Sequence, residues 1–274
     1  MTDSSAGFEP WSDTARWGTL DLLETQRADA VLHLRLNRPA KRNSISDELL
    51  AQIHRVFTNL PAWCRVVVMS GAGEHFCAGL DLNEVAERSV AEGILHSRSW
   101  HACFDAIHAG PVPVVAALHG AVIGGGLELA ASGHIRVADR STYYGLPEGQ
   151  RGIFVGGGGS VRISRLLGVA RMTDMMLTGR VFDADEGQTL GLSNYRVDAG
   201  QGVAKALELA TRIARNAPLS NFAITQALPR IADLSSSDGL FVEALMAAIA
   251  QGDDAAKERV RAFLAKRAPK VGEG

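Results

Sequence analysis

The chain has 274 residues, of which 46% are hydrophobic and 21% charged, and its formal net charge is −2. This composition is ordinary for a globular protein with a sizeable core, and the near-neutral charge without a long basic run argues against nucleic acid as the main partner. Glycine is enriched, with 29 occurrences and dense runs at 120–126 and 152–159. Such clustering indicates functional loops more than disorder.

The cysteines and the ends of the chain bear on its location. Cys64, Cys77 and Cys103 are odd in number and form no CxxC pair, which argues against a disulfide framework or structural zinc and favours the cytoplasm. The first sixteen residues have no apolar core, so no signal peptide is expected. The charge-poor stretch 111–133 is interrupted by glycines, prolines and Glu128, so it is interpreted as buried strand and helix, not as a membrane span.

The predicted elements fall into two regions. A loose extension over 1–16 precedes strands at 20–26 and 30–36, a helix at 47–60, a strand at 65–70, a helical stretch reaching 109, a strand at 112–118, a helix from about 125 and a strand at 135–138. The recurrence of strand, turn and helix predicts a layered α/β core over 17–200. Helical periodicity predicts an all-helical C-terminal region over 201–274.

Glu128 lies in the first turn of a predicted helix that opens on the glycines Gly124–Gly126. An acidic residue there often only complements the helix dipole. Glycines within a helix cost ~1 kcal/mol each, however, so three in a row favour a site where a substrate approaches the backbone. The Gly125 N–H is then a candidate donor to a developing oxyanion.

A second donor is expected from another tight turn, and Ala78, between Cys77 and Gly79, is the candidate. The local alternative is a strand-ending turn in which Asp81 caps the next helix. Cys77 itself indicates a small buried hydrophobe more than a nucleophile.

Glu148 follows Tyr143-Tyr-Gly145 in a loop, where a solvated carboxylate is the default interpretation. Paired with Glu128 it becomes a possible second acid/base group, and the two would titrate jointly. Phosphate-loop, dinucleotide and HExxH motifs are absent, and the histidines lack metal-ligand spacing, so neither a metal nor a cofactor is expected. Lys41-Arg42 forms a short basic loop that suits a phosphate or an exposed turn.

Together these segments resemble the enoyl-CoA hydratase/isomerase family, also called crotonases, over nearly all of residues 20–268. The matching segments are Asn37-Arg-Pro with Lys41-Arg-Asn43, Gly71-Ala-Gly73 with Phe76-Cys-Ala-Gly79-x-Asp81, His119-Gly120 with Gly124-Gly-Gly-x-Glu128-Leu-Ala, Leu146-Pro-Glu148 with Gly152, Leu177-Thr-Gly179, Ala184 with Gly191-Leu192, and Ala262-Phe-Leu-x-Lys-Arg267. Their order and spacing carry the resemblance.

The resemblance implies a spiral of ββα units, a helical C-terminal trimerisation region giving a homotrimer or a dimer of trimers, and an acyl-CoA thioester as ligand. It places Ala78 and Gly125 as the oxyanion-hole amides, Glu128 as the water-activating group and Glu148 as the source of the α-proton. The expected CoA- or substrate-binding residues are Lys41, Arg42, Cys77, Leu80, Asp81, Leu82, Gly124, Trp100, Phe263 and Lys266.

The paired glutamates favour hydration of a 2-enoyl-CoA to a 3-hydroxyacyl-CoA. In the family, simple isomerases typically keep only the Glu148 equivalent, and dienoyl isomerases carry an aspartate where Gly156 stands. An isomerase, a hydratase-lyase on an aromatic or unusual acyl-CoA, and a CoA-binding protein without turnover stay open as alternatives. The loop Val155-Gly-Gly-Gly-Gly159 departs from the usual Pro-Gly-x-Gly-Gly, and Arg151 adds a charge beside it.

Overall fold

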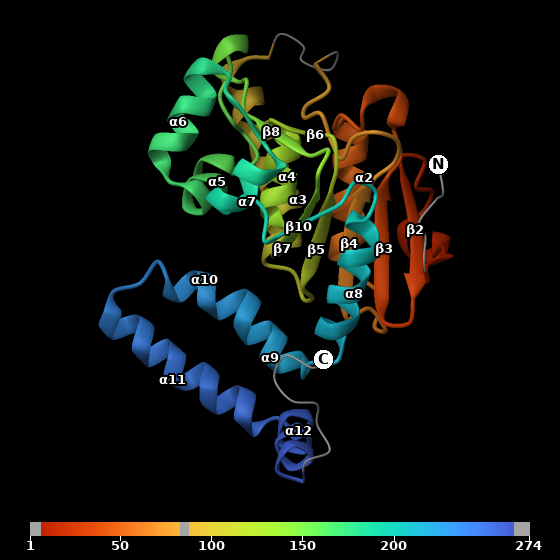
Figure 1. Ribbon diagram of the computed structural model, residues 1–274, viewed down its shortest axis with the longest axis vertical. Helices are drawn as coiled ribbons and strands as arrows, with labels where there is room; N and C mark the ends of the chain where they lie inside the picture. The colour runs from red at the N-terminus through yellow and green to blue at the C-terminus, as the bar shows by residue number, and fades with distance from the viewer. Residues whose placement is uncertain (1–6, 83–87, 266–274) are drawn as a thin grey trace.

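The structure is a computed structural model that describes residues 7–82 and 88–265 (Figure 1). Its main sheet has the strand order β1-β2-β3-β4-β5-β7-β10. The strands are β1 (Glu9–Pro10), β2 (Leu23–Ala28), β3 (Val31–Leu36), β4 (Val66–Gly71), β5 (Val114–Leu118), β7 (Ile135–Asp139) and β10 (Tyr195–Val197). The pairings from β3 onward are parallel, and those of β1 with β2 and β2 with β3 are antiparallel.

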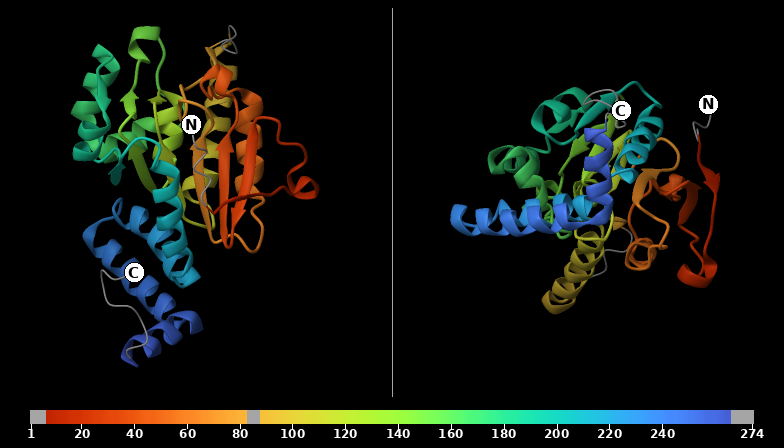
Figure 2. Two further views of the ribbon diagram at one scale, coloured as in Figure 1. Left: turned by 45° about the vertical axis from the view of Figure 1, so that its right-hand side comes forward. Right: turned by 90° about the horizontal axis from the view of Figure 1, so that it is seen from below.

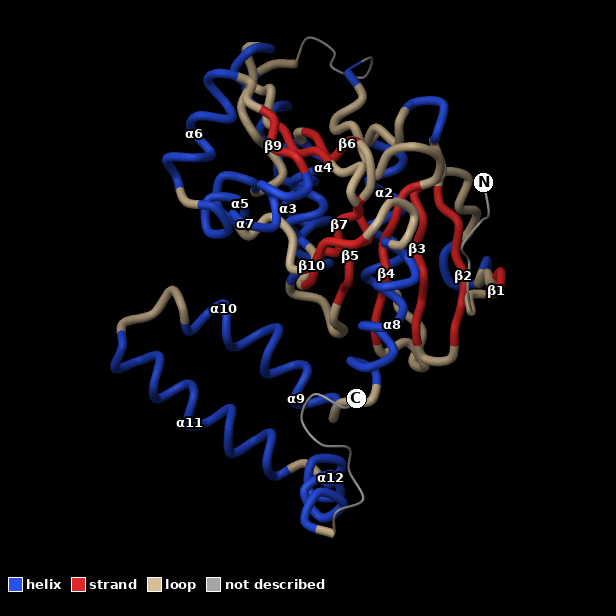
Figure 3. Tube along the Cα trace, in the orientation of Figure 1, coloured by secondary structure: helices blue, strands red, loops and turns tan. Residues whose placement is uncertain are grey.

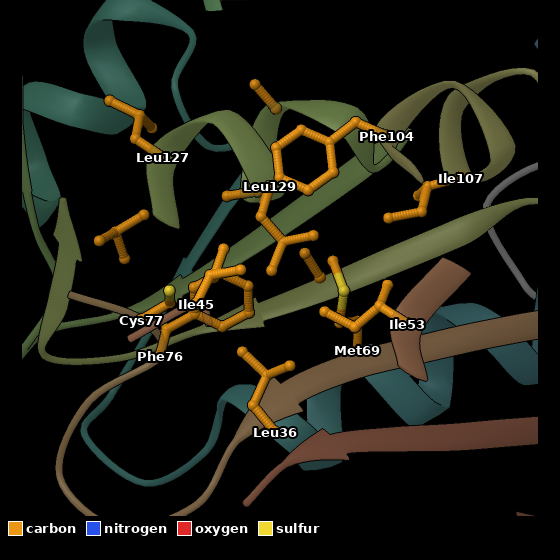
Figure 4. Packing of buried hydrophobic residues seen from close by; sticks show 14 of the residues in the cluster. Leu36, Ile45, Ile53, Met69, Phe76, Cys77, Phe104, Ile107, Leu127 and Leu129 are labelled. Atoms are coloured by element: carbon orange, nitrogen blue, oxygen red, sulfur yellow. The ribbon is translucent and has the colours of Figure 1, made fainter. Parts of the chain in front are cut away.

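Both faces of this sheet are covered, which explains why β4 and β5 consist mainly of apolar residues. Side chains alternate along β4, so Val67 and Met69 join the core on one face while Val66 and Val68 join the core on the other. The first core, part of which is shown in Figure 4, contains side chains of α2 (Asp47–Thr58), α3 (Val90–His108) and α4 (Gly125–Ser132). The opposite face is covered by α8 (Gly202–Ala214).

The starts of α2 and α3 are set by local capping. Ser46 begins α2 because its hydroxyl accepts the Leu49 N–H at 3.1 Å. Ser89 begins α3 through a capping box with Glu92, in which each side chain binds the other residue's backbone N–H. The first helix was predicted over 47–60 and ends at Thr58, and the helical stretch predicted to reach 109 ends at His108.

A small second sheet has the order β6-β8-β9, with β6 (Ala121–Ile123) parallel to β8 (Tyr143–Gly145) and β9 (Val181–Asp183) antiparallel to β8. Around it lie α5 (Gly159–Leu167), α6 (Val169–Thr178) and α7 (Ala184–Leu190). Figure 3 shows the short strands of this sheet above the main one.

The remaining helices are α9 (Pro218–Phe222), a π-helical turn (Ala223–Ala227), α10 (Leu228–Ile231), α11 (Ser236–Gly252) and α12 (Asp254–Leu264). They form an arm that extends away from the α/β core (Figures 1 and 2). The prediction of an α/β fold followed by C-terminal helices is therefore confirmed. Within the described part of the chain, none of the helices has the length and hydropathy of a membrane span.

The predicted loose extension covers residues 1–16, of which 1–6 lie outside the described residues, and residues 7–16 lie against the core. Phe8 is buried against His33, with ring centroids 4.5 Å apart. Trp11 makes edge-to-face contacts with Trp63 and with Trp17, which ends α1 (Thr14–Trp17). Burial of these aromatic rings holds the segment against the core. The polar residues between the rings give no sign of this packing in the sequence.

Candidate active site

Three loops leave the same edge of the small sheet. Cys77 forms a parallel bridge with Val122 of β6, and β6 is parallel to β8. Because the carboxyl ends of neighbouring parallel strands meet at one edge, the segments that follow them lie together. This topology brings Leu80, Gly124–Gly126 and Glu148 to one place, although they are far apart in the sequence.

The three glycines permit the close approach that the sequence suggested. Gly124 has φ 54°, a backbone conformation that residues with a Cβ rarely adopt. A Cβ atom there would lie 2.9 Å from Glu148 Oε1, and one at Gly125 would lie 2.7 Å from the Trp100 ring. At Gly126 a Cβ would lie 2.3 Å from the Cys77 carbonyl oxygen. The start of α4 is therefore packed against all three neighbouring segments.

The candidate oxyanion amides need one correction. The Ala78 N–H already donates to the Arg42 carbonyl at 3.0 Å, so this amide is not available to a ligand. Ile45 pairs with the Gly79 carbonyl and the Asp81 N–H, and since successive N–H groups alternate in direction along a strand, the Leu80 N–H points away from Ile45.

That direction leads to Gly125. A Cβ at Gly125 would lie 3.4 Å from the Leu80 nitrogen, and a Cβ at Gly79 would lie 3.4 Å from the Gly125 nitrogen. Neither the Leu80 nor the Gly125 N–H has an acceptor among the described residues. The pair of available amides is therefore Leu80 and Gly125, not Ala78 and Gly125.

Glu128 is buried, with 4% of its surface exposed. Its Oε1 accepts two hydrogen bonds, from the N–H groups of Gly157 and Gly159, both at 2.8 Å. Burial raises the pKa of the carboxyl above its usual value, and the amides of the glycine loop oppose that rise by stabilising the ionised form. One oxygen is thus fixed by the backbone.

Glu148 is also buried and begins the 3₁₀ turn Gly149–Arg151. Its Oε2 has no hydrogen-bond partner among the described residues. Burial, and further the negative charge of Glu128, raise the pKa of Glu148 to about 7. The two carboxyls therefore influence each other electrostatically, as expected of groups that share one site.

A cavity of about 310 Å³ is lined by both glutamates, Glu128 and Glu148, and by Gly125. Its other lining residues come from the Leu80 turn, from α3 and the segment just before it, and from the segment after Glu148: Leu80, Arg88, Gly93, His96, Ser97, Trp100, Ile153, Phe154, Val155, Gly156 and Gly157. Trp100 was expected here. His96 and Ser97 were not, and only their helical spacing of three to four residues from Trp100 could have indicated them.

A narrow recess of about 20 Å³ adjoins this cavity. Ala78, Leu82 and Gly124 line it together with Leu80 and Glu148. The side chain of Leu82 is about half exposed. These predicted residues therefore lie beside the two carboxyls, while the backbone N–H of Ala78 faces elsewhere.

Two predicted binding residues are held inside the protein. Cys77 points into the apolar core beside Phe76 and Ile45 (Figure 4), and burial raises the pKa of its thiol to about 12. Asp81 is ion-paired with Arg38, with 3.0 Å between its Oδ2 and Nη2. Neither residue lines the cavity, so the expectation that they contact substrate is not supported.

The remaining predicted residues lie outside the cavity. Lys41 and Arg42 are exposed on the loop whose Arg42 carbonyl binds the Ala78 N–H. Phe263 is exposed on α12, in the helical arm away from the core (Figure 1). Lys266 lies outside the described residues. No three His, Cys, Asp or Glu side chains of the described ranges come together as metal ligands would.

The chain is similar to known proteins over most of its length. A family model described as enoyl-CoA hydratase/isomerase matches residues 26–274. A mevalonyl-coenzyme A hydratase from Aspergillus fumigatus is 37% identical over 87% of this chain and 90% of that protein. A 2,3-dehydroadipyl-CoA hydratase from Escherichia coli is 33% identical over 90% of this chain and 97% of that protein.

Solved structures give the same result. A crystal structure from Rhodopseudomonas palustris, provisionally described as an enoyl-CoA hydratase, is 56% identical over 90% of this chain and 95% of that one, with a TM-score of 0.88. An enoyl-CoA hydratase from Bacillus anthracis is 32% identical over 91% of this chain and 98% of that one, with a TM-score of 0.85. The chain belongs to the enoyl-CoA hydratase/isomerase family.

Proposed function

We propose that the protein adds water across the double bond of a 2-enoyl-CoA thioester to form a 3-hydroxyacyl-CoA. The observation that carries the proposal is that one cavity is lined by two buried carboxyls and lies at two backbone N–H groups without acceptors among the described residues. The hydratase names of the relatives are consistent with it.

In this proposal the thioester carbonyl oxygen accepts hydrogen bonds from the Leu80 and Gly125 N–H groups. Attack of water at C3 moves negative charge onto that oxygen, and amides already fixed in place stabilise the charge by several kcal/mol. The Gly125 amide is also the first of α4, so the partial positive charge of the helix start acts in the same direction.

The two carboxyls handle the protons. Glu128 is the base: its Oε1 is held by two amides, which leaves Oε2 to take a proton from the attacking water. Glu148, whose pKa is raised to about 7, is partly protonated near neutral pH and delivers a proton to C2. Dehydration runs the same transfers in reverse.

We propose that the acyl tail occupies the cavity along α3 and that Lys41 and Arg42 interact with the phosphates of CoA. The wall combines apolar side chains such as Trp100 and Val155 with the polar side chains of Arg88, which precedes α3, and His96, which is on α3. The two relatives above are named for mevalonyl and dehydroadipyl thioesters, so tails with polar ends belong in any substrate panel.

The test is turnover of crotonyl-CoA and of longer, aromatic and carboxylate-ended enoyl-CoAs by the wild type and by Glu128→Gln and Glu148→Gln. Each variant should lose more than about 100-fold in kcat, because glutamine cannot transfer a proton. Glu74→Gln, at an exposed position, is the matched control and should keep full activity. Near-full activity in either cavity variant contradicts the two-carboxylate mechanism.

An isomerase or hydratase-lyase would use the same two amides, and product analysis with 3-enoyl and hydroxycinnamoyl thioesters separates these reactions from hydration. Binding of CoA thioesters without turnover across the whole panel would instead indicate a non-catalytic family member.

A further inference from the structure

The loop that holds Glu128 is made of four consecutive glycines, Gly156–Gly159. Two of their amides bind Glu128 Oε1, so the orientation of this carboxyl depends on the loop's conformation. Glycine has more backbone freedom than any other residue, and a run of four would sample many conformations if nothing restrained it. Other parts of the protein must therefore supply the restraint.

Two side chains restrain the loop through its carbonyl groups. The Ser97 hydroxyl, on α3, donates to the Gly156 carbonyl oxygen at 2.7 Å. Arg162 Nη1, on α5, donates to the Gly157 carbonyl oxygen at 3.0 Å. Arg162 is itself ion-paired with Asp105 of α3. Adjacent peptide groups of the loop are thus tied to two different helices.

Packing from α3 also shapes the loop. A Cβ at Gly157 would lie 2.7 Å from the Phe104 ring, and a Cβ at Gly159 would lie 2.8 Å from Glu128 Oε1. Ser97 and Phe104 are seven residues apart, so they lie on the same face of α3. Gly157 and Gly159 therefore need to lack a Cβ for this close approach. The hydrogen bond from Ser97 adds a directional restraint that packing alone does not give.

We propose that Ser97 is a positioning residue for this enzyme, fixing the glycine loop whose amides orient Glu128 for its reaction with water. The proposal rests on the proposed function in taking Glu128 as the base. Ser97 acts through the loop and not on the reacting atoms, because its hydroxyl proton is given to Gly156.

The first test is the steady-state kinetics of Ser97→Ala as a function of pH. Loosening the loop should lower kcat by about 10-fold with little change in KM, since the misplaced group is needed in the transition state. Weaker amide bonds also favour the neutral carboxyl, so the acid limb of the kcat/KM profile should move to higher pH. Ser97→Thr, which keeps the hydroxyl, should restore both values.

Ser99→Ala is the matched control. Ser99 is on the same helix, but its exposed hydroxyl binds the His96 carbonyl of its own helix and does not approach the loop. This variant should behave as the wild type in rate and pH dependence.

A second measurement does not depend on turnover. Infrared titration of the Glu128 carboxyl, assigned by the loss of its band in Glu128→Gln, should give a higher pKa in Ser97→Ala than in the wild type. The proposal is overturned if Ser97→Ala leaves both the pKa of Glu128 and the acid limb of the kcat/KM profile unchanged. This holds whether the variant keeps its activity, loses it together with a lower Tm, or changes only in KM. If the infrared shift appears but Glu128→Gln remains active, the loop restraint stands and the proposed function fails.

Discussion

At the scale of single residues, Glu148 lies in an environment that differs strongly from solution. Its carboxyl is buried near Glu128, and its pKa of about 7 in the folded protein exceeds the ordinary 4.5. The folded state therefore binds a proton more tightly than the unfolded state does. The contribution of this group to stability is present below pH 4.5 and is lost as the pH rises through about 7.

Glu148→Gln should therefore stabilise the protein at high pH, because it replaces a buried charge by a neutral group of similar shape. We expect the difference in Tm between the variant and the wild type to grow between pH 4.5 and 7 and to be constant above that range. Thermal scans across this range check it, with Glu74→Gln, at an exposed position, as the control. A difference independent of pH would contradict the raised pKa.

A second feature of single residues is that Leu80, and not Ala78, has a backbone N–H available to a ligand. The sequence marks the turn as a source of a donor, and the turn does lie beside Gly125. Which amide faces the cavity depends on which carbonyls lie across from it, here those of Arg42 and Ile45. Those partners come from a segment more than thirty residues earlier, so local pattern does not reveal them.

At the scale of elements, the start of α4 is the feature on which the site depends. Its three glycines let the helix approach the Leu80 turn, Trp100 and Glu148 together. The glycine triplet is visible in the sequence, and the structure places its Gly125 in the wall of the cavity that Glu128 and Glu148 line. The reason for each glycine appears only when its neighbours are in position.

Gly125→Ala tests this packing. The added methyl would lie 2.7 Å from the Trp100 ring, so the helix start or the ring must move, and the Gly125 N–H moves with it. We expect a fall in kcat of about 100-fold, since small displacements of a catalytic group have effects of this size. Circular dichroism should show an intact fold.

The control is Gly252→Ala, near the end of α11, where a Cβ meets no atom within 4 Å. It should have wild-type kinetics. Wild-type turnover in Gly125→Ala would show that the amide at this position does not take part.

At the scale of the whole molecule, the helical arm exposes apolar side chains. On α11 alone, Leu240, Phe241, Leu245 and Ile249 are each about half exposed or more. Several large apolar side chains exposed on one helix are typical of an interaction site. The arm also projects from the core (Figure 2), which leaves this surface open to a second chain.

We therefore expect a homotrimer or a dimer of trimers in solution, as the family resemblance implies. Light scattering should give the mass of three or six chains. The double variant Phe241→Glu and Leu245→Glu should lower that mass, because charges at these positions would be buried without partners in the interface. A monomeric wild type at micromolar concentration would contradict the expectation.

The sequence by itself determined the α/β core, the helical C-terminal region and the family, and it marked Glu128, Glu148 and Gly125, which the structure brings to one cavity. It did so because hydrophobic periodicity, helix caps and glycine runs are local signals, readable without knowing what packs against them. Only the tertiary structure decided that Leu80 and not Ala78 offers its amide, that Cys77 and Asp81 face inward, that Ser97 binds the glycine loop, and that residues 7–16 are packed. Each of these depends on a partner distant in the chain, and the direction of a hydrogen bond or the burial of a ring is set by that partner.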